Sequence, residues 1–74
     1  MARVIAPSTQ EHDEYTWDMT IDGEDYQVTQ WLDPAGEATV RFLYRKVARG
    51  WQCITAVDAV DRWLAQHHLV LTTT

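Results

Sequence analysis

Residues 15–45 read YTWDMTIDGEDYQVTQWLDPAGEATVRFLYR, and the two turns inside this stretch predict the fold. Asp22-Gly23 is a favoured centre for a two-residue hairpin turn, because both central residues need positive φ. Asp33-Pro34-Ala35-Gly36 fits a type I turn with Pro at its second position and Gly at a left-handed bulge position. The turns predict three antiparallel strands, at residues 15–21, 24–32 and 37–45.

The turns also predict a register. The first pairs Trp17 with Val28, and the second pairs Leu32 with Ala38 and Val28 with Phe42. Side chains alternate between faces along a strand, so both turns place apolar residues on one face, which we expect to carry the core. Its apolar members are Tyr15, Trp17, Met19, Ile21, Tyr26, Val28, Leu32, Ala38, Val40, Phe42 and Tyr44. Its polar members are Gln30 and Glu24.

The other face carries most of the charge in this register. Asp25 is expected directly opposite Arg45, and Arg41 opposite Thr29. Trp31 and Leu43 are expected to point away from the core on this face. An exposed Trp beside Leu and Arg has the composition of an interface hot spot.

A helix is the alternative structure for residues 37–49. Val40, Tyr44 and Val47 fall on one helical face, and Gly50 would serve as a C-cap. That helix would turn Phe42 outward among three arginines, so we expect the strand.

A helix is expected near the C-terminus. Thr55-Ala56-Val57-Asp58 resembles a capping box, with Asp in place of the usual Glu. Val57, Val60, Leu64 and His67 then recur at helical spacing. The helix is predicted from about residue 56 to 67, covering the apolar face of the sheet. Residues 51–54 are either a connector or a fourth strand, and the sequence leaves both open.

The predicted fold class is α+β: a three-stranded antiparallel meander, four-stranded if residues 51–54 join it, packed on one C-terminal helix. The 74 residues are expected to form a single small domain. Residues 1–13 show no clear period and are expected to be irregular, with residues 69–74 as a tail.

The single cysteine, Cys53, excludes an intramolecular disulfide. Its neighbours Trp51 and Ile54 predict a small buried side chain. No segment is long enough to span a membrane, and the apolar part of the N-terminus is too short for a signal peptide. We expect a cytoplasmic protein without a membrane partner.

Enzyme motifs are absent from the sequence. It has no phosphate loop, nucleotide fingerprint, nucleophile elbow or HExxH, so we expect no catalytic residues and no cofactor. The candidates for a metal site are His12, Asp13, His67 and His68. Adjacent His67 and His68 would point about 100° apart on a helix, so no metal site is predicted.

Charge is segregated along the chain, whose net charge is −5. Residues 11–33 hold eight acids and no Lys or Arg, whereas residues 41–49 hold four bases and no acid. Uncompensated charge is either tolerated for solubility or used to steer a partner. The predicted partner-binding residues are Asp18, Asp22, Glu24, Asp25, Trp31 and Leu43.

The expected function is therefore that of a small acidic protein–protein interaction module that occupies a basic surface, such as that of a nucleic-acid-binding complex. Acidic side chains can imitate phosphates, and phages and mobile elements encode small acidic inhibitors of host machinery, including anti-CRISPR proteins. The open sheet face is also a candidate homodimer surface.

The alternative is a nucleic-acid-binding module. A three-stranded sheet backed by one helix resembles the arm-type DNA-binding domains of phage integrases and the plant-type three-stranded DNA readers, which lay a basic, aromatic face in the major groove. The resemblance is one of architecture and carries no residue motif. The charge distribution assigns the contacts of such a module to the basic third strand, with Arg41, Arg45, Lys46 and Arg49. Asp18 and Asp25 on the same face oppose phosphate contacts.

Overall fold

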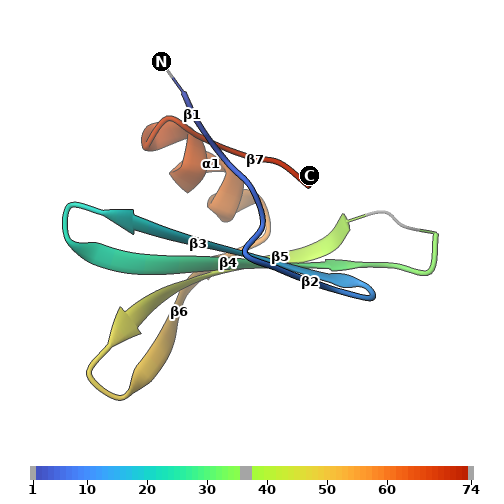
Figure 1. Cartoon of the computed structure of the whole chain (residues 1–74), viewed down its shortest axis with the longest axis horizontal. Coiled ribbons are helices and arrows are strands. Elements are labelled where there is room, and N and C mark those ends of the chain that lie inside the picture. Colours follow the sequence, from blue (N-terminus) through green and yellow to red (C-terminus); the bar gives the residue numbers. More distant parts are fainter. Residues whose placement is uncertain (1, 36–37, 74) are drawn as a thin grey trace.

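The computed structural model describes residues 2–35 and 38–73, and its centre is a five-stranded antiparallel sheet of order β2-β3-β4-β5-β6. The strands are β2 (Thr9–Glu11), β3 (Glu14–Ile21), β4 (Glu24–Leu32), β5 (Ala38–Val47) and β6 (Gly50–Ala56). One face is covered by the helix α1 (Asp58–Gln66), beside a parallel pair of β1 (Arg3–Ile5) and β7 (Leu69–Leu71) (Figure 1). The predicted α+β class, an antiparallel meander with one C-terminal helix, is confirmed.

The meander extends beyond the three strands that the turns predict. Residues 51–54 lie in strand β6 and are not a connector, and residues 38–47 form a strand and not the alternative helix. The N-terminal segment, expected to be irregular, contains β1 and β2, and the expected tail contains β7. Strands of three residues are too short to show a period of two in the sequence.

The first hairpin has the predicted register. Asp22 and Gly23 have φ of 52° and 80°, as a two-residue turn of this type requires. Trp17 lies opposite Val28, and Ile21 lies opposite Glu24.

The second hairpin begins as predicted and then changes register. Leu32 lies opposite Ala38, and the Asp33 carboxylate accepts a hydrogen bond from the Ala35 N–H at 2.9 Å. Gly36, predicted at a left-handed bulge position, is outside the described residues. The next pair is Trp31 with Val40, so Thr39 is an extra residue, a β-bulge.

The bulge moves every later pair of β5 by one residue and exchanges the faces of the strand. Val28 lies opposite Leu43 instead of Phe42, and Leu43 is fully buried in the core. Val40, Phe42 and Tyr44 turn to the face away from α1. The prediction that Phe42 and Tyr44 lie in the core while Leu43 is exposed is therefore wrong.

Gln30 supplies the physical reason. Its side chain is only 5% exposed on the core face, and the predicted register would set it against Val40, which offers no hydrogen bond. The bulge sets it against Arg41, whose Nε donates to the Gln30 Oε1 at 2.9 Å. Arg41 also donates to that oxygen through Nη2 and forms an ion pair with Asp61 on α1. Leaving a buried amide unsatisfied costs about 1–3 kcal/mol.

The core lies between the sheet and α1. Its buried side chains are Trp17, Met19, Val28, Leu43, Val60, Leu64 and Leu69. The Trp17 Nε1 donates to the carbonyl oxygen of Thr72 at 2.7 Å, which ties the chain after β7 to the sheet. Trp17 and Val28 of the sheet belong to the same buried cluster as Val60 and Leu64 of α1, so the helix covers the apolar face of this hairpin as expected.

The start of α1 differs from the predicted capping box. Thr55 still belongs to β6, and the N-cap is Val57, with φ of 59° and no side-chain cap. The Val57 N–H donates to the Arg41 carbonyl at 2.8 Å, so the chain leaves the sheet only at this residue. Val57 is consequently 55% exposed, and His67 is exposed as well, so the buried stripe of α1 is shorter than expected.

Candidate functional site

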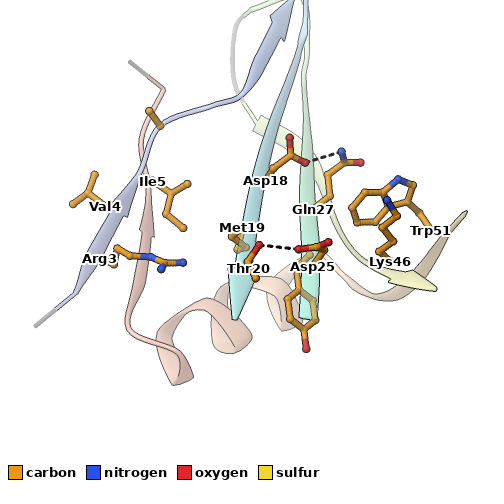
Figure 2. A pocket seen from close by; sticks show the side chains of 12 residues that line it. Arg3, Val4, Ile5, Asp18, Met19, Thr20, Asp25, Gln27, Lys46 and Trp51 are labelled. Atoms are coloured by element: carbon orange, nitrogen blue, oxygen red, sulfur yellow. Dashed lines mark hydrogen bonds between the residues drawn. The ribbon is translucent and has the colours of Figure 1, made fainter. Parts of the chain in front are cut away.

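A groove of about 740 Å³ lies along the open edge of β3 and continues onto the face of the sheet away from α1, with β1 on one side and the β5–β6 hairpin on the other (Figure 2). We call it the β3 groove. Its polar and charged lining residues are Arg3, Asp18, Thr20, Asp25, Gln27 and Lys46, and the ring of Trp51 stands beside Lys46. The strands β3 and β4 place two carboxylates of the predicted acidic surface on its floor.

Each of these carboxylates is positioned by an uncharged donor on the neighbouring strand. The Asp18 Oδ1 accepts a hydrogen bond from the Gln27 Nε2 at 3.0 Å, and the Asp25 Oδ1 accepts one from the Thr20 hydroxyl at 2.7 Å. Both acids are exposed, and neither forms an ion pair within residues 2–35 and 38–73. The charges are thus held in place without being neutralised.

The edge of β3 beside the groove is open. β2 pairs with Glu14 to Thr16 on that side, and no described strand pairs there with the rest of β3. In an antiparallel ladder, alternate residues direct their N–H and C=O groups to opposite sides. Counting from the turn at Asp22-Gly23, the main-chain groups of Asp18 and Thr20 point away from β4, toward the groove. An extended segment could therefore add to β3 there.

The other predicted partner-binding residues lie at different distances from this groove. Asp22 and Glu24 are exposed at the adjoining hairpin turn. Trp31 is 45% exposed on the same face, at the opposite end of β4. Leu43 is fully buried, so its assignment to the partner surface is wrong because the bulge turns it into the core.

The four bases proposed for nucleic-acid binding do not form one strip. Arg41 and Arg45 share the α1 face of β5, and Arg41 is engaged by Gln30 and Asp61. Arg45 lies opposite Tyr26, so the predicted pair with Asp25 is wrong. Lys46 lines the β3 groove, and Arg49 sits in the β5–β6 turn.

The open face also carries residues that the sequence analysis did not assign to it. The rings of Phe42 and Tyr44 lie 6.3 Å apart there, and Trp51 is 43% exposed at the groove. Cys53 is exposed, not buried as predicted, because β6 is an edge strand with no neighbour on its outer side among the described strands. The sequence signal for β6 as a strand was Gly50. It has φ of 122° and directly follows the two-residue turn that joins β5 to β6.

The described residues contain no cluster of three or more His, Cys, Asp or Glu side chains placed to hold a metal ion. None of the helices in this part of the chain has the length and apolar character needed to cross a membrane. Comparison of the chain with protein-family models, with curated proteins and with solved structures finds no match. The functional argument therefore rests on the β3 groove itself.

Proposed function

We propose that this protein is an interaction module that binds a basic, extended segment of a partner protein in the β3 groove. The observation that carries the proposal is the pair of exposed carboxylates on the groove floor, Asp18 and Asp25, each oriented by a neutral donor. Hydrogen bonds between ionised groups are about twice as strong as neutral ones. A Lys or Arg side chain entering the groove would meet acceptors that are already in position.

The borders of the groove narrow the choice of ligand. Arg3 and Lys46 stand at its two sides, so a ligand with an unbroken run of bases would be repelled at the margins. Trp51 offers an aromatic face to a cation, which attracts it by about 0.5–1 kcal/mol at an exposed site. The ligand expected from this arrangement carries one or two bases at its centre and uncharged residues on either side.

The main chain of the ligand would pair with the open edge of β3. Strand addition of this kind derives its affinity from backbone hydrogen bonds and its specificity from alternate side chains. Asp18 and Thr20 supply the free N–H and C=O groups, and the surrounding acids attract a basic partner over a longer range. Affinity and charge preference thus come from the same strand.

Such a module would act by occupying its partner. Its size and acidic surface support a role as a cytoplasmic inhibitor, from a phage or mobile element, of a basic nucleic-acid-binding complex, in the manner of an anti-CRISPR protein. In this role Asp18 and Asp25 would stand where phosphates normally bind.

The test is a binding titration in which fluorescence anisotropy of a labelled peptide is the readout. The probe is a labelled ten-residue peptide of Thr and Val with two central lysines, and the variant is Asp18→Asn with Asp25→Asn. We expect this variant to bind about tenfold more weakly, since a charged hydrogen bond contributes about 1.5–3 kcal/mol before solvent screening. The wild-type affinity should also fall steeply with added salt, as exposed charges are screened within about 8–10 Å.

The matched control is Glu11→Gln with Asp13→Asn, which removes the same charge outside both the groove and the β6 edge. Equal weakening by the control would show that net charge, and not the groove, attracts the peptide, and would refute the proposal. Wild-type protein that ignores the peptide but binds a labelled DNA duplex would point to the nucleic-acid module instead.

A further inference from the structure

We infer that β6 is a homodimer edge, at which two copies of this chain pair antiparallel and join their sheets into one. β6 is the last strand of the five-stranded sheet, and its outer edge has no partner among the described strands. Its seven residues, Gly50–Ala56, contain no charged side chain. An open edge is normally protected by charges, Pro, a β-bulge or extreme shortness, and the half of β6 that precedes its irregularity at Ile54 has none of these.

The apolar character of this edge supports an interface. Trp51 and Ile54 are exposed large side chains of β6, and Val57 follows directly after the strand. The β5–β6 ladder is irregular at Ile54, where Leu43 lies opposite Thr55 and Tyr44 opposite Cys53. The regular half of the edge therefore runs from Gly50 to Cys53.

The hydrogen-bonding pattern predicts the register of the pair. Val47 and Gly50 close the two-residue turn, so the main-chain groups of Trp51 and Cys53 point outward, away from β5. A two-fold axis at Gln52 places Trp51 of each copy opposite Cys53 of the other. The outward N–H and C=O groups of Trp51 and Cys53 are then hydrogen-bonded in both copies, as an isologous contact requires.

Charge favours the antiparallel arrangement with a second copy. Residues 38–57 contain no acid, and the acidic strands β3 and β4 lie at least two strands from the seam, about 10 Å, which is close to the screening length. Arg49 precedes β6 and Asp58 follows it. In the register about Gln52, Arg49 of each copy faces the end of β6 in the other near Thr55, on the side that leads into the acidic start of α1, and this happens twice.

The consequence is a continuous open face with a β3 groove in each half. Two linked sites raise the avidity for a partner that offers two basic segments, without any new contact. The seam uses the main chain of Trp51 but neither Asp18 nor Asp25, and its tests measure mass and cross-linking, not peptide binding, so this inference stands or falls separately from the proposed function.

The first test measures the mass of the protein in solution by light scattering. Wild-type protein at sub-millimolar concentration should show twice the monomer mass of 8.6 kDa. Ile54→Lys should be monomeric, because it places a lysine near Arg49 of the second copy. The matched control is Val70→Lys on β7, which is equally exposed (48% against 46%) and should remain dimeric. A monomeric wild type, or loss of the dimer in both variants, would overturn the inference.

The second test locates the axis. With Cys53→Ser removing the native thiol, Gln52→Cys should form a disulfide-linked dimer on mild oxidation, because residues on the axis of a non-hydrogen-bonded pair lie about 4.5 Å apart at Cα. Val70→Cys in the same background should remain unlinked. Equal linking of the two variants would mean random collision, and linking of Val70→Cys alone would place the seam at β7.

Discussion

The two hairpins β3–β4 and β4–β5 differ in how far the turn sequence predicts the register of the strands. In β3–β4, the turn at Asp22-Gly23 sets the first pair, and every later pair follows from it. In β4–β5, the first pair of Leu32 with Ala38 is also the one that the turn predicts, but the ladder then takes up Thr39 as an extra residue. A good turn sequence therefore determines where a hairpin closes without determining the register beyond the first pairs.

What determines the remaining register is the set of side chains that each face must hold. In β3–β4, alternation brings Trp17 and Val28 together toward α1, and none of the buried side-chain N or O atoms in the described residues lacks a hydrogen bond. In β4–β5, Gln30 needs a polar partner on the core face, and Arg41 can reach it only after a one-residue shift. A bulge disrupts the strand ladder and so costs free energy. It forms here because a buried amide without a hydrogen bond would cost more.

The largest expected effect comes from replacing each of the two candidate core residues of β5 by Ala in turn. Leu43→Ala should lower the free energy of unfolding by about 2–5 kcal/mol, because it leaves a cavity in the core. Phe42→Ala should cost less, since Phe42 is half-buried on the open face. Urea denaturation monitored by Trp fluorescence measures both. The reverse ranking would restore the register without a bulge.

A double-mutant cycle tests the reason for the bulge. Arg41→Met and Gln30→Met should show a coupling free energy of about 1.5–3 kcal/mol, the range for a hydrogen bond to a charged group. The control cycle pairs Gln30→Met with Arg45→Met, because Arg45 lies on the same face opposite Tyr26. Coupling of equal size in the two cycles would mean that Arg41 acts through general charge only.

The smallest effect concerns the first turn. Gly23→Ala should cost about 1–2 kcal/mol, the price of a left-handed conformation for a residue with a Cβ. The added Cβ meets nothing within 4 Å, so the whole cost is conformational. Gly23→Asn should recover part of it, because Asn tolerates positive φ. Thermal melting that ranks Asn below Ala would show that the turn is held by contacts that its backbone angles do not reveal.

The candidate site was predictable in part. The acids Asp18 and Asp25 belong to the first hairpin, where alternation alone assigns them to the open face. Lys46 and Trp51 were not predictable as neighbours, because their pairing depends on β5 having exchanged its faces and on β6 closing onto it. Arg3 reaches the groove only through the parallel pair of β1 with β7, which joins the two ends of the chain.

By itself, the sequence determined the turn at Asp22-Gly23, the positions of three strands and the presence of one C-terminal helix, because these follow from local backbone preference and periodicity. Only the tertiary structure decided which face of β5 is buried. That choice depends on Gln30, Arg41 and Asp61, which come from two strands and the helix and meet only when the sheet is covered. This bulge has no strong local signature in the sequence, because the interactions that stabilise it join residues that are distant in the chain.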